Sequence, residues 1–194
     1  SLVYTTHFIS MAIEKYVTRS IILESYDQGE HDRAYKIFTR EFGLLICQAK
    51  SIRKLESKLR PHVLPRTLSL VTLVKGREVW RLVGAESEAL DSKYIHEVTT
   101  LLKRFIRGEG THKALYDRLI QFMNSSSLYE ERSTRLLLYY ILLVELGYAD
   151  AKMIGAKNIE EYVSFSIDDL YTHLLLSEKS VRHHVREVLE EIQL

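Results

Sequence analysis

The hydrophobic period of this chain of 194 residues changes once, near residue 86, and this change constrains the fold more than any other feature. Between residues 16 and 86 the apolar residues come in short runs rich in β-branched and aromatic types, separated by turn residues about every eight to twelve positions. Runs of this kind are typical of antiparallel strands. After residue 86 the apolar residues recur at spacings of three and four, the period of an α-helix. The sequence therefore predicts a β-rich half followed by a helical half.

Five strands are expected in the first half, and the connections between them decide how they pair. Three short connections contain Gly29, Gly43 or Gly76, each able to adopt the positive φ of a tight turn. The remaining connection, residues 50–66, is too long for a hairpin. Such an arrangement favours a small closed barrel of the oligonucleotide- and oligosaccharide-binding (OB) type over an open sheet with two bare edges. The expected strands are residues 16–25, 32–39, 44–49, 67–74 and 79–85.

The second half is predicted to be an all-α helical bundle. Asp91 is the expected cap of its first helix, and Gly147 is the expected terminus of a strongly apolar helix that starts near Leu128. The chain is thus expected to be an α+β protein with an OB-fold domain at residues 11–86 and a helical domain at residues 87–194. Residues 1–10 precede Met11, a plausible start, and are interpreted as an added or alternative N-terminal extension.

Several function classes are disfavoured by what the sequence lacks. With Cys47 as its single cysteine, the chain has neither a disulfide framework nor a zinc site of several thiolates, and it suits a reducing compartment. No apolar run reaches the roughly 18 residues of a membrane span, and no glycine-rich phosphate loop is present. The eight histidines are scattered. We therefore expect no catalytic constellation, no metal, no cofactor and no membrane partner, and a cytoplasmic location.

The net charge of +1 conceals an asymmetry between the halves. Residues 1–85 carry a net charge of +6 and the remainder −5. Six of the cations fall within residues 50–66, where only Glu56 opposes them. A basic surface of this size favours a polyanion partner slightly over an ordinary solvated surface.

The basic half contains a succession of short motifs, in this order: Gly29-Glu30-His31-Asp32-Arg33, Phe38-Thr39-Arg40-Glu41-Phe42-Gly43, Ala49-Lys50 and Ser57-Lys58-Leu59-Arg60. This succession resembles the N-terminal domain of the RecO family of bacterial DNA repair proteins. The resemblance continues more weakly from Tyr94 to Tyr148. Ser51 stands where the family usually has glycine, and the four-cysteine zinc module of many relatives has no counterpart, so the resemblance implies no metal.

The resemblance implies a non-enzymatic mediator of DNA repair and recombination. Such a protein binds single-stranded and also double-stranded DNA, anneals complementary strands, and acts with RecR to help RecA load onto DNA coated with single-strand-binding protein. It also implies that the helical half recognises the acidic, Phe-ended tail of single-strand-binding protein. The alternative is an interaction adaptor of the recombination machinery with only secondary DNA binding, and an enzyme is a third, less favoured class.

The candidate site residues follow from the basic loops and the aromatic residues beside them. Cations on barrel loops can follow a phosphate backbone, and exposed rings can stack on bases. The alternative reading is that the cations only solubilise, that half of the rings are core, and that Arg33 or Arg40 holds strand ends together. The candidate partner-binding cations are Lys103, Arg104 and Arg135. The candidate DNA contacts are Lys50, Arg53, Lys54, Lys58, Arg60, Arg33 and Arg40 for phosphates, with Tyr35 and Tyr26 for base stacking.

Overall fold

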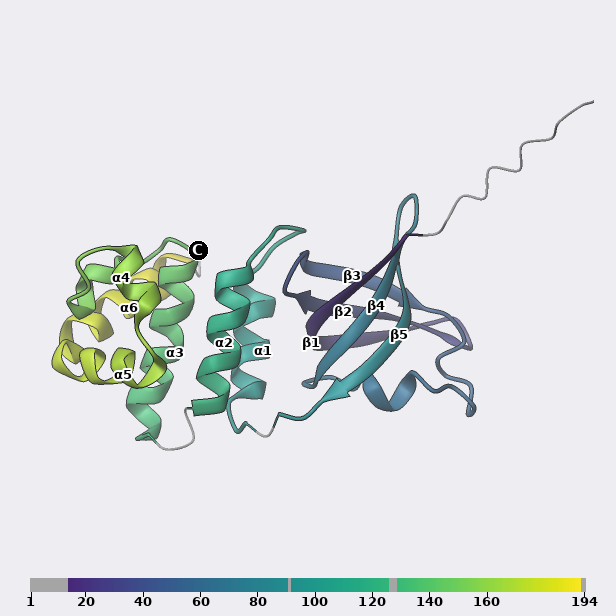
Figure 1. Ribbon diagram of the computed structural model, residues 1–194, viewed down its shortest axis with the longest axis horizontal. Helices are drawn as coiled ribbons and strands as arrows, with labels where there is room; N and C mark the ends of the chain where they lie inside the picture. The colour runs from purple at the N-terminus through teal and green to yellow at the C-terminus, as the bar shows by residue number, and fades with distance from the viewer. Residues whose placement is uncertain (1–13, 91, 126–128, 193–194) are drawn as a thin grey trace, which may run out of the picture.

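The computed structural model describes residues 14–90, 92–125 and 129–192, and it places a β-barrel and a set of helices next to each other along the long axis (Figure 1). The barrel comes first in the chain, as the hydrophobic period predicts. Its strands are β1 (Lys15–Gln28), β2 (Asp32–Thr39), β3 (Gly43–Ala49), β4 (Leu68–Lys75) and β5 (Trp80–Glu88), with a short 3₁₀ helix, η1 (Arg60–His62), between β3 and β4.

The five strands form a closed barrel in the order β1-β2-β3-β5-β4. Neighbouring strands are antiparallel except at the closure, where β3 runs parallel to β5 through the pairs Cys47–Trp80 and Gln48–Arg81. This order and the long β3–β4 connection are those of the OB fold. The predicted fold class is confirmed, and every strand begins and ends within three residues of the expected position.

The barrel interior is filled by the inward-facing residues of each strand. Ile22, Ile37 and Leu45 are almost completely buried there, together with Cys47 and Trp80. Burial raises the pKa of the Cys47 thiol to about 12, so the thiol stays protonated at neutral pH. Cys47 is therefore a small core residue rather than a nucleophile, as its position in the strand predicts.

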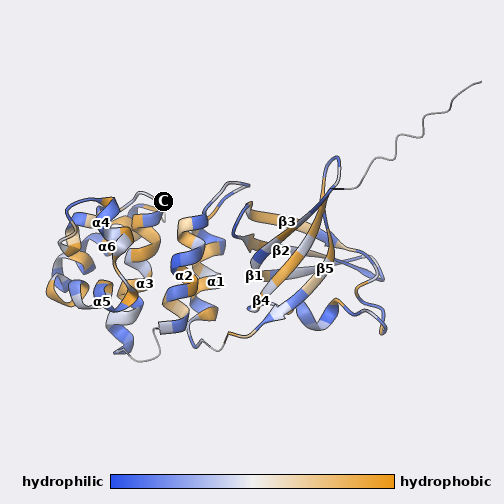
Figure 2. Ribbon diagram, viewed as in Figure 1, coloured by the Kyte–Doolittle hydropathy of each residue, from blue (hydrophilic) through white to orange (hydrophobic). Residues whose placement is uncertain are grey.

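A second core lies against the outer face of the same strands. Ile21 and Leu23 of β1, Phe38 of β2 and Leu44 of β3 point away from the barrel interior and pack with the first helices. The run Ile21-Ile22-Leu23 is thus buried on both sides, which explains why it is continuously apolar rather than alternating. One hydrophobic cluster extends from this barrel face through the whole helical half (Figure 2).

The helical half is the predicted bundle, built around α3. This helix packs against α2, α5 and α6, and most of its residues are buried. Gly147, with a φ of 79°, ends the turn after α3 in the expected left-handed conformation. The helices are α1 (Ile95–Phe105), α2 (Lys113–Ser125), α3 (Glu131–Glu145), α4 (Ile159–Ser164), α5 (Ile167–Leu176) and α6 (Glu178–Ile192), with a 3₁₀ helix η3 (Ala151–Ile154).

The structure corrects the expected start of α3. Glu130 caps α3 by accepting hydrogen bonds from the backbone N–H groups of Arg132 and Ser133, so α3 begins at Glu131. The expected start at Leu128 and the expected cap Asp91 both lie outside the described residues. None of the helices described is long and apolar enough to cross a membrane.

The barrel and the helices are also joined by backbone contacts at the β2–β3 turn. The Gly110 N–H donates to the Phe42 carbonyl at 3.3 Å, and Gly43 forms a β-bridge with Glu109. Gly43 has a φ of 70°, and a Cβ placed there would lie 1.8 Å from the Gly110 carbonyl oxygen. Glycine is therefore required at this position both for its conformation and for the close approach of two backbones.

We predict that Gly43→Ala lowers the free energy of unfolding by about 3 kcal/mol, because the methyl group forces the two backbones apart. Gly29→Ala is the matched control, since Gly29 has a φ of 64° but no atom within 4 Å of its Cβ position. That control should lose only about 1 kcal/mol, the cost of the left-handed conformation. Urea denaturation of both variants checks the difference, and equal losses would contradict the close contact.

Candidate nucleic-acid interface

The long connection between β3 and β4 is anchored to the end of the barrel that lies away from the helices (Figure 1). Ile52 and Val63 are each 1% exposed because their side chains enter the barrel core. The Arg53 N–H donates to the His31 carbonyl at 3.0 Å, and the Arg66 N–H donates to the Ile22 carbonyl at 2.7 Å. The connection therefore closes this end of the barrel and holds its cations in fixed positions.

Ser51 makes the first turn of this connection without the usual glycine. It has a φ of 54°, in the left-handed region, and its backbone N–H donates to the Asp32 carboxylate at 2.7 Å. That hydrogen bond holds the strained turn in place. The departure at position 51 therefore leaves the tight backbone turn intact.

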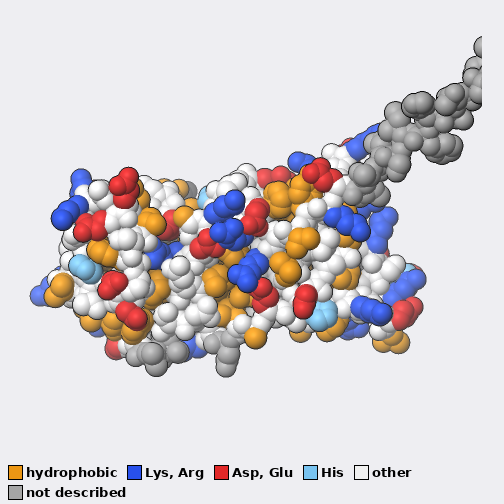
Figure 3. Space-filling model, viewed as in Figure 1, with side chains coloured by type: hydrophobic (Ala, Val, Ile, Leu, Met, Phe, Trp, Pro, Cys, Tyr) orange, Lys and Arg blue, Asp and Glu red, His pale blue; other side chains and the backbone are white. Residues whose placement is uncertain are grey.

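Five of the seven predicted phosphate contacts lie on this connection, and four of these five share two properties. Their side chains are exposed, and none of them forms an ion pair with any residue that the structure describes. Figure 3 shows Lys and Arg side chains gathered at this end of the molecule. We call this set the basic end of the barrel: Lys50, Lys54, Lys58 and Arg60.

Arg33 and Arg53 lie at the same end but share one carboxylate. Arg33 Nε is 2.7 Å from Asp27 Oδ1, and Arg53 Nη2 is 3.6 Å from Asp27 Oδ2. Arg53 also donates to the Gly29 carbonyl at 2.8 Å. The hydrogen bond from Arg33 holds the pKa of Asp27 below its usual value. These two arginines retain an excess of positive charge because two cations face one anion.

The structure contradicts the expectation that Arg40 contacts phosphate. Its guanidinium donates to both carboxylate oxygens of Asp117 on α2, at 2.7 and 2.8 Å, and to Glu41 at 3.0 Å. The β2–β3 turn faces the helices rather than the basic end of the barrel. Arg40 therefore joins the β2–β3 turn to α2, a role that differs from the alternative considered for it, the joining of strand ends.

The expectation that Tyr35 stacks on a base is also wrong. Tyr35 is 2% exposed, because it lies on the inward side of β2 together with Ile37. Tyr26 is 49% exposed and its ring remains available for stacking. A hydrogen bond with Glu24 raises the pKa of Tyr26 to about 12.

The three predicted partner-binding cations do not form one site. Lys103 on α1 faces the barrel, where it contacts Glu24 at 3.1 Å. Arg104 lies over the ring of Phe105, with 5.6 Å from its guanidinium carbon to the ring centroid. Arg135 on α3 is the only one of the three that reaches a cleft.

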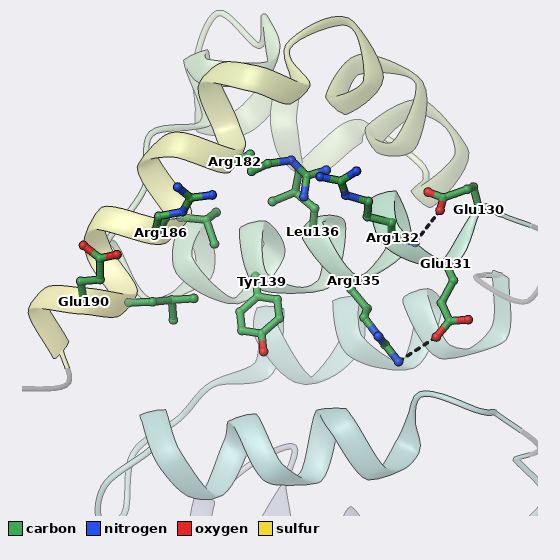
Figure 4. A pocket seen from close by; sticks show the side chains of 11 residues that line it. Glu130, Glu131, Arg132, Arg135, Leu136, Tyr139, Arg182, Arg186 and Glu190 are labelled. Carbon is green, nitrogen blue, oxygen red and sulfur yellow. Dashed lines mark hydrogen bonds and ion pairs between the residues drawn. The ribbon is translucent and has the colours of Figure 1, made fainter.

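This cleft lies between α3 and α6 and has a volume of about 800 Å³ (Figure 4). Arg132 and Arg135 come from α3, and Arg182 and Arg186 come from α6. The two pairs of arginines are about 50 residues apart in the sequence. The sequence analysis therefore identified Arg135 but not the other three. The apolar part of the lining is Leu136, Tyr139, Val185 and Leu189, and Glu130, Glu131 and Glu190 complete it.

The described ranges contain no group of three or more His, Cys, Asp or Glu side chains placed to hold a metal ion. The ionisable groups whose pKa is most perturbed are buried tyrosines and Cys47, which are dispersed through the cores. The exposed cations at the basic end of the barrel can attract a polyanion electrostatically.

Comparisons with known proteins agree with this geometry. Residues 11–91 match the family described as "Recombination protein O N terminal". A DNA repair protein RecO of Heliobacterium modesticaldum is 37% identical over 71 residues, which cover 37% of this chain and 26% of that protein. One of Rubrobacter xylanophilus is 36% identical over 72 residues, covering 37% and 29%. One of Acidovorax ebreus is 32% identical over 110 residues, covering 50% and 41%.

The fold and the surface define an OB-fold protein with a basic barrel end and an attached helical bundle. Residues 11–91 of the chain are similar to the N-terminal domain of the recombination protein O (RecO) family. The matched stretch spans less than half the length of each of these curated relatives.

Arg40 and Lys54 should respond differently to the same substitution. We predict that Arg40→Gln lowers the free energy of unfolding by about 1 kcal/mol or less, because the lost ion pairs are partly exposed and screened by solvent. Lys54→Gln should change it by less than about 0.5 kcal/mol, since Lys54 forms no ion pair with a described residue. Urea denaturation at low and high salt checks this, and an equal response of the two variants would contradict the assigned roles.

Proposed function

We propose that the chain is a non-enzymatic mediator of DNA repair and recombination that binds DNA at the basic end of the barrel. The observation that carries this proposal is the anchored connection that presents Lys50, Lys54, Lys58 and Arg60 without neutralising partners among the described residues. The similarity of residues 11–91 to the RecO family supports the DNA repair role. The proposed location is the cytoplasm, with the nucleoid as the place of action.

The position of the helices limits where DNA can lie on the barrel. OB folds bind oligonucleotides through the face of strands 2 and 3 and the loops after β1 and β4. Here Phe38 and Leu44 of that face are covered by the helical half. The open surface at the other end includes the β1–β2 turn at Gly29 and the β3–β4 connection, and Lys75 and Arg77 flank the β4–β5 turn. We therefore place the DNA strand across this end.

Annealing follows from contacts that neutralise phosphates and leave base edges free. Lysine and arginine contacts to phosphates reduce the repulsion between two strands. Contacts to the backbone carry no sequence information, so the bases stay available for pairing. The proposed partners of this activity are single-stranded and double-stranded DNA, with RecR and, indirectly, RecA as protein partners.

We predict that replacing Lys50, Lys54 and Lys58 together by Ala weakens binding to single-stranded DNA of any sequence. The slope of log affinity against log salt should become less steep by about 2, which corresponds to three lost phosphate contacts. Fluorescence anisotropy with a labelled oligonucleotide at several salt concentrations measures the slope.

A triple variant of Lys152, Lys157 and Lys179 is the matched control for this experiment. These lysines are exposed on the helical half, and their loss changes the net charge by the same amount. The control should retain the wild-type slope. An unchanged slope in the barrel variant would show that the basic end does not contact the DNA backbone.

A second function, docking of an acidic partner, is supported by the cleft between α3 and α6. Arg132 and Arg186 form no ion pair with a described residue and lie beside an apolar floor, whereas Arg135 pairs with Glu131 and Arg182 pairs with Glu178. Two unpaired arginines next to an apolar floor suit a peptide with carboxylates and a terminal aromatic residue. We propose that this cleft, rather than Lys103 or Arg104, receives the tail of single-strand-binding protein. If this binding dominates over DNA binding, the chain acts as an adaptor.

We predict that Arg132→Ala combined with Arg186→Ala weakens binding of an acidic peptide ending in Phe by about tenfold, through the loss of two charge contacts. Arg107→Ala combined with Lys157→Ala is the control of equal charge and should bind as the wild type. Anisotropy of the labelled peptide gives both affinities. A loss in the control equal to that in the cleft variant would point to nonspecific attraction instead of a defined site.

A further inference from the structure

A small cavity beside the basic end of the barrel has a lining unlike that of the larger clefts. It has a volume of about 190 Å³ and is lined by Arg33, Tyr35, Ile52, Arg53 and Arg60. Three of these five side chains are guanidinium groups. They come from separate parts of the chain, one from β2 and two from the β3–β4 connection, so the barrel fold itself brings them together.

The charged groups at this cavity do not cancel. Asp27 is paired with both Arg33 and Arg53, and Arg60 has no ion pair with any described residue. Three guanidinium groups against one carboxylate leave an excess of two positive charges. The site therefore favours an anion.

The volume of the cavity and the hydrogen-bond donors that line it indicate which class of anion it can hold. A volume of about 190 Å³ is below the roughly 300–1,000 Å³ of pockets that hold drug-sized ligands. It has room for about six water molecules at roughly 30 Å³ each. Guanidinium groups bind phosphate oxygens in pairs, and the Tyr35 hydroxyl lines the same space as a further donor.

We propose that this cavity is a phosphate-binding subsite that takes one phosphate group of a DNA strand bound at the basic end of the barrel. The inference rests on the proposed function for its source of phosphate, but the subsite is defined by its own residues. Tyr35 then has a role that differs from stacking, since its buried ring supports the cavity and its hydroxyl faces the anion.

The phosphate has two possible sources on a DNA strand. An internal phosphodiester carries one negative charge, whereas a phosphate at a strand end carries about 1.5 to 2 at pH 7. The excess of two positive charges at the cavity is balanced better by the strand end. A terminal phosphate also fits a small cavity more easily than an internal one, because the DNA backbone continues from it in only one direction.

The test compares three forms of one labelled oligonucleotide, with a 5′-phosphate, a 3′-phosphate or neither. We expect wild-type protein to bind one phosphorylated form about fivefold more tightly than the unphosphorylated form, the gain of about one exposed ion pair. Arg60→Gln should abolish this preference. Tyr35→Phe, which keeps the ring in the core, should reduce it about twofold.

Lys58→Gln is the matched control, because Lys58 lies on the same connection but outside the cavity. It should weaken all three oligonucleotides equally and leave their ratio unchanged. If Arg60→Gln instead weakens all three equally and by more than Lys58→Gln, the subsite holds an internal phosphate. If Arg60→Gln matches Lys58→Gln in every respect, the subsite does not exist.

A second measurement separates this inference from the proposed function. Thermal unfolding is followed in inorganic phosphate and in chloride at equal ionic strength, without DNA. Phosphate should raise the Tm of the wild type and of Lys58→Gln by more than that of Arg60→Gln, which keeps only the general stabilisation that phosphate gives to folded proteins. DNA binding without these effects would overturn the subsite alone, whereas phosphate stabilisation without DNA binding would overturn the proposed function and leave the subsite.

Discussion

The structure depends on the burial of strand β1 from both sides. Ile22 faces the barrel interior while Ile21 and Leu23 face the helices, and all three are almost completely buried. Burying one such side chain contributes about 1.5–3 kcal/mol, so Ile21 and Leu23 stabilise the contact between the barrel and the helices. Because the helices cover one side of the barrel, the opposite end is left open to solvent.

The positions of the carboxylates determine which cations are neutralised and which can contact a partner. At the junction, Arg40 meets Asp117 and Lys103 meets Glu24. On the β3–β4 connection Glu56 is the only acidic residue, and it forms no ion pair with a described cation. The same residue types therefore hold the two halves together on one side of the barrel and form a basic surface on the other.

The sequence predicts the fold well because the relevant signals are local. Strand lengths and turn glycines determine the barrel, and the spacing of apolar residues determines the helices. The same strand pattern predicts that Tyr35 is buried and cannot stack on a base, because Tyr35 and Ile37 are two residues apart and therefore lie on the same side of the strand. The role of Arg40 could not be predicted, because Asp117 lies 77 positions further along the chain. The cleft between α3 and α6 was missed for the same reason, since it exists only after α6 packs against α3.

The hydrogen bonds that fasten the β3–β4 connection to the barrel have a consequence for the thermodynamics of recognition. Ile52 and Val63 hold this connection in the core, so its backbone is already ordered in the unbound protein. Binding then costs little conformational entropy in the protein main chain. Most of the entropic cost comes from ordering the flexible polymer and the long side chains. A main chain that is ordered before binding therefore gives a higher affinity than a flexible loop that carries the same cations.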